Sequence, residues 1–403
     1  MKITVSRITE IMIYLYLLVL MISSNTGDIT VKIVRVVIMF FLFLYFVSVN
    51  SFKWVRSSYC RLVILFLVYN AIMCEYAFSK KYAVEYTMTL LYVIIVNVFI
   101  CQFFYVHKNT LFSVLKVFIL GALIKAIFLF GRHGMFVFMN NRATGGTSAN
   151  TVGFYCAFAA VFSFYFYLYE GRKKRYIIFF VFSVCFMFLS ASRKALVFLA
   201  IPIVFWYLLK NKNVFMVLRN IIIVVIIGWG LTTAILKNPF LYELIGRRIE
   251  GMINGLFNKG VADASTRTRL SLIQFGMDFF KQKPWFGYGM SNFKALVEVY
   301  RKGGSVYYAH NNYVELLVDC GIWGTVIYYS LYIKMIVSGI KNIKKRETSQ
   351  ILAMGCLLSI VIAEYGMVTY NSAVLQLLLL VFFFFLVDNN INFKEKEYEN
   401  YIK

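Results

Sequence analysis

Long apolar runs follow one another along most of this 403-residue chain. A helix needs about 20 apolar residues to cross the hydrocarbon core of a bilayer, and about 17–25 are tolerated. By this measure the sequence predicts about twelve spans. We expect them near residues 8–24, 31–50, 60–78, 85–106, 111–130, 150–169, 175–190, 194–210, 219–236, 311–333, 351–368 and 371–387. The expected fold class is therefore an all-α integral membrane protein.

Composition supports the same class. Hydrophobic residues make up 61% of the chain and charged residues 15%, whereas a soluble domain has about 45–50% apolar and about 25% charged residues. The high aromatic content and the lack of a Gly-X-Y period exclude a disordered or collagen-like chain. The formal net charge of +24 lies mostly in short loops. We expect no nucleic-acid partner, because no folded basic face with a recognisable binding motif is present.

The basic loops predict an orientation. Cytoplasmic loops of membrane proteins are enriched in Lys and Arg, and alternate loops of this chain hold most of these residues outside one long segment. That set of loops and both termini are expected to be cytoplasmic, with the first apolar run retained as a span because no convincing cleavage site follows it. The predicted parts are spans one to nine in residues 1–236, a large extracytoplasmic loop in 237–308, spans ten to twelve in 309–390 and a cytoplasmic tail in 391–403.

The long outward loop is the one loop large enough to hold structure of its own. Ser265 is a plausible N-cap for a helix, Pro284 stops it, and Gly287 and Gly289 form a turn beyond it. The apolar residues at helical spacing are Leu270, Ile273, Met277 and Phe280. This pattern predicts an amphipathic helix that lies on the membrane surface or closes over a cavity.

Arginine side chains gather on the expected outer side, where orientation signals do not explain them. They are Arg142, Arg193, Arg247, Arg248, Arg267 and Arg269. A guanidinium keeps its proton and forms paired hydrogen bonds with phosphate, so this surface suggests a phosphate or diphosphate ligand. Contact with anionic lipid headgroups is the alternative. For Arg193, between two apolar runs, we favour a partner inside the bundle over snorkelling, because a charge near hydrocarbon costs about 2.5–3.5 kcal/mol.

His310 opens a span directly after the long loop. The dipole at a helix N-terminus disfavours imidazolium, so we expect a neutral ring that can accept a proton. The alternative is a histidine that is only hydrogen-bonded at the interface. Three acidic residues remain as weaker candidates for a carboxylate role: Asp278, Glu298 and Glu364.

Several kinds of chemistry lack their usual signatures. No P-loop, H-E-x-x-H, G-x-S-x-G or D-x-D motif occurs, which disfavours ATP-driven transport, zinc proteolysis, the α/β-hydrolase mechanism and metal-dependent nucleotide-sugar transfer. The seven cysteines are scattered through the apolar runs. We expect them to be buried thiols, without disulfides and without a metal site.

Four sequence elements together resemble the O-antigen ligase and polymerase superfamily. They are Ser190-Ala191-Ser192-Arg193-Lys194-Ala195; Ser265-Thr266-Arg267-Thr268-Arg269-Leu270 with Pro284-Trp285-Phe286-Gly287-Tyr288-Gly289; His310-Asn311-Asn312-Tyr313 with Gly321-Ile322-Trp323-Gly324; and Asn141-Arg142-Ala143-Thr144-Gly145-Gly146 with Asn150. They cover about residues 140–335 in the order of the family.

The resemblance implies a GT-C-type, inverting glycosyltransferase that needs no metal and no cofactor. Its donor would be a glycan linked to undecaprenyl diphosphate. Carried over by position, Arg193 and Arg269 would hold the diphosphate, and His310 would assist deprotonation of the acceptor hydroxyl. The supporting substrate contacts would be Arg142, Asn150, Arg267 and Asn311.

Three functions stay open. A polymerase would extend a lipid-linked repeat unit on the outer side of the bacterial cytoplasmic membrane, and the Ser-Arg-Lys-Ala and His-Asn-Asn-Tyr segments resemble polymerases most. A ligase would transfer the glycan to lipid A core or to a protein. A non-enzymatic flippase is disfavoured, because the arginines gather at one face of the membrane. The expected partners are the lipid-linked oligosaccharide as donor and acceptor, membrane lipids and a chain-length regulator.

Overall fold

The computed structural model describes residues 4–23, 29–49, 53–141, 143–209, 214–239, 264–300, 308–342 and 347–388, together with Tyr242, Gly246 and Glu250. Its main helices are α1 (Val5–Ile22), α2 (Ile29–Ser48), α3 (Lys53–Arg56), α4 (Ser58–Met73), α5 (Lys80–Val106), α6 (Thr110–His133), α7 (Val137–Asn140), α8 (Ala149–Tyr169), α9 (Lys174–Leu189), α10 (Arg193–Leu209), α11 (Val214–Lys237), α14 (Ala264–Gln282), α15 (Asn292–Tyr300), α16 (Asn312–Asn342), α17 (Thr348–Glu364) and α18 (Ala373–Leu386). Two short strands, β1 (Ala143–Thr144) and β2 (Thr147–Ser148), pair antiparallel. The all-α fold predicted from the sequence is confirmed.

Each of the expected spans coincides with one of these helices. Among the described residues, six helices are long and apolar enough to cross a membrane: α1, α2 from Thr30 onward, α5, α6, α8 and α16. The helices α4, α17 and α18 are shorter but also apolar. The chain is therefore a multi-pass membrane protein, while the number of twelve crossings stays a prediction.

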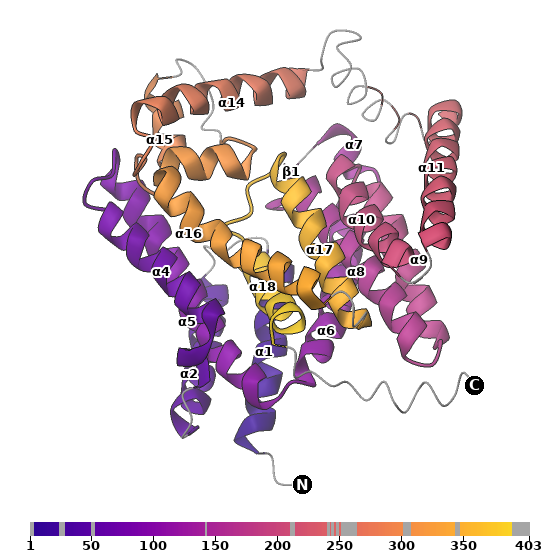
Figure 1. Cartoon of the computed structure of the whole chain (residues 1–403), viewed down its shortest axis with the longest axis horizontal. Helices are drawn as coiled ribbons and strands as arrows, with labels where there is room; N and C mark the ends of the chain where they lie inside the picture. Colours follow the sequence, from indigo (N-terminus) through magenta and orange to yellow (C-terminus); the bar gives the residue numbers. More distant parts are fainter. Residues whose placement is uncertain are drawn as a thin grey trace.

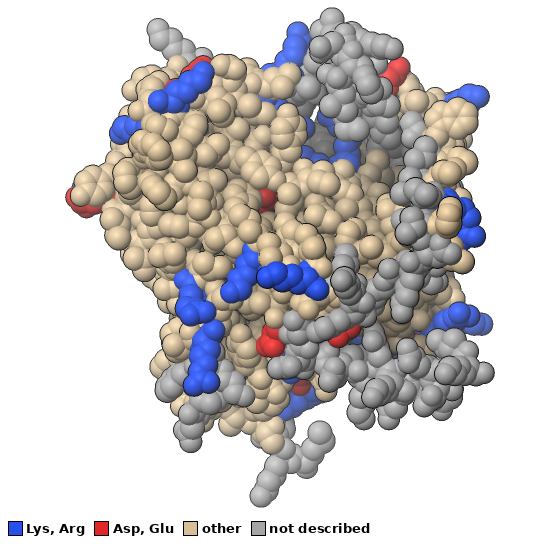
Figure 2. All heavy atoms as spheres, in the orientation of Figure 1, with Lys and Arg blue, Asp and Glu red and all other residues tan. Residues whose placement is uncertain are grey.

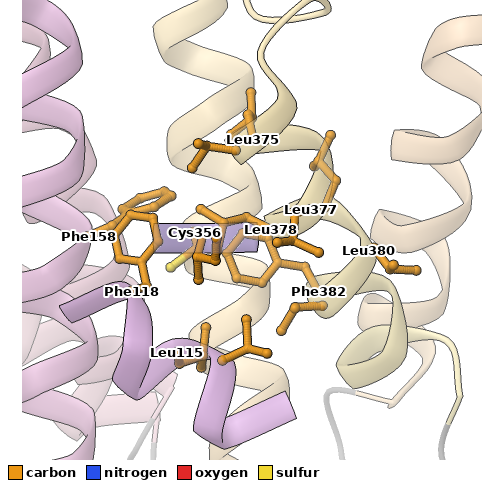
Figure 3. Packing of buried hydrophobic residues seen from close by; sticks show 14 of the residues in the cluster. Leu115, Phe118, Phe158, Cys356, Leu375, Leu377, Leu378, Leu380 and Phe382 are labelled. Carbon is orange, nitrogen blue, oxygen red and sulfur yellow. The ribbon is translucent and has the colours of Figure 1, made fainter. Parts of the chain in front are cut away.

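Helix α18 lies at the centre of the bundle (Figure 1). Its sequence is apolar on every side, and a helix of this kind is buried on every side. All residues from Val374 to Leu386 are buried. Figure 3 shows Leu378 and Phe382 of α18 close to Phe118 of α6 and Phe158 of α8. The core of the molecule is thus built around α18, which is shorter than the apolar helices α4 and α17.

Both ends of the described chain meet the loop between α5 and α6. The Oγ atom of Ser6 lies 2.9 Å from Nε2 of His107, and Lys108 forms an ion pair of 3.5 Å with Asp388. Helix α14 crosses the opposite end of the bundle (Figure 1). The two ends of the described chain therefore lie on the same side, as an even number of crossings requires. That this side is cytoplasmic stays a prediction.

Helix α14 is the amphipathic helix predicted between Ser265 and Pro284. Its apolar side packs on α15 and on the first part of α16, where Leu272 joins Phe293 and Val314 in a second hydrophobic cluster. The sequence-based apolar stripe is wrong at its first position, because Leu270 is 53% exposed whereas Leu272 is fully buried. The apolar face of α14 is turned toward α15, and the sequence analysis did not predict this partner.

The α16 helix is interrupted at Gly321, which has φ 62° and ψ −170°. This kink exchanges backbone hydrogen bonds with the segment 284–289. The bonds run from Tyr288 N to Val318 O (2.9 Å), from Gly289 N to Asp319 O (2.8 Å) and from Ile322 N to Pro284 O (2.8 Å). The backbone groups that the kink frees are therefore satisfied, as membrane-embedded backbone requires.

Glycine is required on both sides of this contact between the segment 284–289 and the kink in α16. A Cβ atom on Gly321 would lie 2.4 Å from the Trp285 carbonyl oxygen, and a Cβ atom on Gly287 would lie 2.6 Å from the Gly321 nitrogen. Both residues also have a positive φ that side chains rarely adopt. The Pro-Trp-Phe-Gly-Tyr-Gly and Gly-Ile-Trp-Gly motifs thus form the two halves of one backbone joint, which attaches the end of α14 to α16.

Candidate active site

His310 lies in the short segment, residues 308–311, that leads into α16. Its backbone is in the left-handed region, with φ 56°. Its ring centre lies 4.0 Å from that of Tyr308. The next residue, Asn311, caps α16, because its Oδ1 accepts a hydrogen bond from the Val314 N–H at 3.1 Å. The buried Nδ1 atom of His310 has no hydrogen-bond partner among the described residues.

The electrostatic surroundings keep the His310 ring neutral. Burial lowers the pKa of His310 most, and the positive charges of Arg269 and Lys194 lower it further, to about 4. A neutral imidazole was expected from the sequence on the basis of the helix dipole. The structure adds a stronger cause, since desolvation and two cations all disfavour the charged ring.

Arg269 approaches His310 from α14. Its side chain is half-buried, whereas that of Arg267 is exposed. Two residues along a helix correspond to a rotation of about 200°, so the two arginines lie on different sides of α14. The structure therefore brings Arg269 to His310 and leaves Arg267 at the surface. Among the described residues, no carboxylate forms an ion pair with Arg269.

The turn between α9 and α10 carries Arg193 and Lys194. It lies against the start of α8, where Ser192 donates a hydrogen bond of 2.9 Å to Oδ1 of Asn150. Gly153 makes this approach possible, because a Cβ atom there would lie 2.8 Å from Oγ of Ser190. Asn150 thus positions the turn. Arg193 is the first residue of α10 and is half-buried.

The loop between α17 and α18, residues 365–372, joins the turn to the histidine segment. At one end, Nζ of Lys194 donates to the carbonyl of Gly366. At the other end, Oδ1 of Asn312 accepts from the N–H groups of Thr369 (2.9 Å) and Tyr370 (3.2 Å). Residues from three distant parts of the sequence therefore meet around this loop.

Three buried acids support the same region, and two of them were missed by the sequence analysis. Glu315 accepts from the Ala309 N–H at 2.7 Å, directly before His310. The carboxylate of Asp319 accepts from the backbone of Ser291 (2.8 Å) and Phe293 (2.7 Å). An acid inside an apolar run is costly and is itself a signal of a role, so the sequence could have pointed to both.

The three acidic candidates from the sequence lie in different surroundings. Glu364 is buried and accepts from the hydroxyls of Tyr329 and Tyr332, both at 2.9 Å. Glu298 is exposed and accepts from Tyr82. Asp278 is exposed on α14 beside Lys281. Of the three, Glu364 lies nearest in sequence to the loop that holds Lys194, and its carboxylate is already engaged by hydroxyl groups.

Some predictions fall outside the described residues or stay predictions. Arg142, Arg247 and Arg248 lie outside the residues that the structure describes. Within those residues, no group of three or more His, Cys, Asp and Glu side chains could hold a metal ion, and a metal-free reaction stays a prediction. The cysteines are free thiols, and five are buried as expected, but Cys74 is half-buried and Cys185 is exposed.

The surface of the molecule has a hollow that contains basic side chains. Figure 2 shows Lys and Arg side chains inside a depression between α14 and α10. Comparison with known families identifies this region. Residues 177–329 match the family model described as O-antigen ligase. This part of the chain is similar to the O-antigen ligase family. No curated protein matches the chain.

The O-antigen ligase match contains Arg193, Lys194, Arg269 and His310. The match confirms the predicted resemblance to the O-antigen ligase and polymerase superfamily over residues 177–329, and it supports a function of the O-antigen ligase or polymerase type. Chemically, the arrangement combines a neutral proton acceptor with fixed cations. Such a pair suits the attack of a hydroxyl group and the departure of an anion.

Proposed function

We propose that the chain is a polysaccharide polymerase of the O-antigen or capsule type. It transfers a growing glycan from undecaprenyl diphosphate onto a lipid-linked repeat unit on the outer side of the cytoplasmic membrane. One observation carries the proposal: the His310 imidazole is held neutral beside Arg269 and Lys194, within a region that matches the O-antigen ligase family.

The proposed reaction is a single displacement at the anomeric carbon of the donor. A hydroxyl oxygen of the acceptor sugar forms the new glycosidic bond, while the bond between that carbon and the diphosphate oxygen breaks. The hydroxyl proton passes to the His310 ring, and the electron pair of the broken bond leaves with the diphosphate. Arg193 and Arg269 neutralise the charge that develops there. This route inverts the anomeric carbon and uses no metal.

A ligase is the second candidate, because the matching family is described as O-antigen ligase. The donor, the leaving group and the roles of His310 and the arginines are the same in both reactions. The difference lies in the acceptor, which is another lipid-linked repeat unit for the polymerase and lipid A core or a protein for the ligase.

Deletion of the gene separates these functions. Loss of a polymerase leaves single repeat units on the surface anchor. Loss of a ligase leaves long chains on the polyprenyl carrier. Loss of a flippase leaves single repeat units on the inner leaflet and would contradict an enzymatic role. Restoration by the wild-type gene, and not by a gene carrying Arg269→Ala, would link the phenotype to the site.

A further inference from the structure

Two tryptophans lie exposed at the joint between the segment 284–289 and α16. Trp285 and Trp323 are 56% and 51% exposed, and Phe286, the next residue along the segment, is 56% exposed. The two indole rings stack on each other, with ring centroids 6.3 Å apart and planes inclined by 30°. Tryptophan is on average a highly buried residue, so an exposed group of large aromatic side chains indicates a partner outside the chain.

The face of α16 that follows Trp323 indicates what surrounds this pair. Its large exposed apolar residues recur at helical spacing and are Val326, Ile333, Val337 and Ile340. Lys341 then ends the apolar stripe. Lys334 also lies on the exposed side, about two turns before that end, and its long apolar stem lets the ammonium group extend toward water. An apolar stripe of this kind on a membrane-spanning helix faces lipid chains.

The length of the stripe matches the hydrocarbon core of a bilayer. The helix from Trp323 to Lys341 is about 27 Å long, and the hydrocarbon core is about 30 Å thick. The aromatic pair therefore lies at one boundary of the hydrocarbon, and the lysine lies at the other.

Helix α5 indicates the same boundary independently. Glu85 is exposed and is the last charged residue of this helix. Met88, also exposed, begins an apolar surface that continues toward Val106. The helix from Met88 to Val106 is again about 27 Å long. Two helices from distant parts of the sequence thus have apolar spans of the same length.

Polar contacts lie on the far side of this boundary. Tyr82 of α5 donates to Glu298 of α15 at 2.9 Å, and Lys294 of α15 donates to the Tyr86 hydroxyl at 2.7 Å. Helix α15 in turn packs with α14 and the first part of α16 in the second hydrophobic cluster. The end of the molecule that includes α14 and α15 therefore begins where the apolar spans end.

We propose that Trp285, Trp323 and Phe286 form an interfacial anchor, which binds the headgroup layer of the bilayer and fixes the level of the joint in the membrane. Indole rings suit this layer because they combine a large apolar surface with a polar N–H group. Lys281 and Lys283 are exposed at and just beyond the end of α14, and suit the phosphate groups of the same layer. Because α14 is attached to α16 through the joint, the anchor also sets the height of α14 above the hydrocarbon.

Fluorescence quenching by labelled lipids tests this placement in the full-length protein. The chain has five tryptophans, and replacement of four of them by phenylalanine leaves either Trp285 or Trp323 as the single emitter. The protein is placed in vesicles of phosphatidylcholine and phosphatidylglycerol that carry a nitroxide either near the headgroup or near the end of the acyl chain. The label near the headgroup should quench each emitter at least about twice as strongly as the deep label.

Trp229 of α11 provides the matched control. It is exposed and lies about 12 Å along the helix from Lys237, where α11 ends. As the single emitter it should be quenched more strongly by the deep label. Wild-type protein made with fluorotryptophan gives a second measurement that needs no multiple replacement. The same two labels should broaden its fluorine resonances in the same pattern, and single Trp→Phe variants assign these resonances.

Two outcomes would overturn the anchor. Stronger quenching of Trp285 and Trp323 by the deep label would place the joint within the hydrocarbon. Quenching by aqueous iodide, without an effect of either lipid label, would show that the pair faces water, as a surface for a glycan or a partner protein would. Neither outcome changes the roles of His310 and Arg269, so the proposed function stands or falls by its own variants.

Discussion

His310 combines three properties: a left-handed backbone, a buried Nδ1 atom without a partner among the described residues, and two neighbouring cations. A left-handed conformation at a non-glycine residue persists only where the surrounding structure stabilises it. Here the Asn311 cap and the Glu315 bond to Ala309 supply that support from either side. These hydrogen bonds fix the backbone of His310 and therefore the position of its imidazole ring.

Replacing this ring should affect turnover and leave donor binding intact. We expect His310→Gln to lower turnover by about 100- to 10,000-fold, the range usual for a positioned general base. Turnover is measured as incorporation of repeat units by the purified protein, and donor binding by calorimetry. The same substitution at His107, at the opposite end of the bundle, is the control. Full turnover in His310→Gln would exclude the ring as the proton acceptor.

The pH dependence of kcat/KM should report the pKa of His310 in the protein without bound substrate. Because the pKa of His310 is lowered to about 4, the neutral base form is present at every higher pH. As pH falls through that value, the ring gains a proton and kcat/KM should fall. Between pH 5.5 and 8 this group should cause no change. A rise of kcat/KM centred near pH 6.5 would mean that His310 is not the base, or that it lies in water.

The two arginines of α14 provide a matched comparison. Arg269→Ala should lower chain extension by about 100-fold or more, as expected when a group that stabilises developing negative charge is removed. Arg267→Ala removes an exposed guanidinium two residues away and should have a much smaller effect. Both variants should insert into the membrane at wild-type levels. Equal loss in both would indicate that α14 acts through its general charge and not through one side chain.

At the scale of elements, the joint between the segment 284–289 and α16 determines where α14 lies. Gly321→Ala should lower the free energy of unfolding by about 2 kcal/mol or more, because the residue has a positive φ and the added Cβ would meet the Trp285 carbonyl. Gly131→Ala, in a position with open space around it, is the control. The measurement is thermal unfolding in detergent. Equal stability of the two variants would show that the joint contributes little.

The sequence predicted those helices whose ends are marked by residues close to them in the chain. Helix α14 was predicted because Pro284 ends it and a plausible cap opens it. The kink at Gly321 was not predicted, since it depends on a contact with residues 284–289 that no local pattern records. Lys194 was quoted as part of a motif, but its contact with Gly366, far along the chain, was not predicted. Glu315 and Asp319 were overlooked although acids within an apolar run were visible in the sequence.

For the whole molecule, the charge distribution predicts which side faces the cytoplasm. In a background without the native cysteines, Lys281→Cys on α14 should react with an impermeant maleimide from outside intact cells. Lys341→Cys, at the other end of α16, should react only after the membrane is opened. Both positions are exposed, so accessibility to the reagent depends on the side alone. The reverse pattern would place the candidate site in the cytoplasm and contradict the proposed function.

The position of α18 has a consequence for biosynthesis. This helix fills the middle of the bundle, yet the ribosome makes it after all of the helices that surround it. Until translation reaches Ala373, the earlier helices have no central partner and remain loosely assembled in the bilayer. A prematurely terminated chain would therefore lack the helix on which its core packs, so that only chains translated through α18 reach the packed fold.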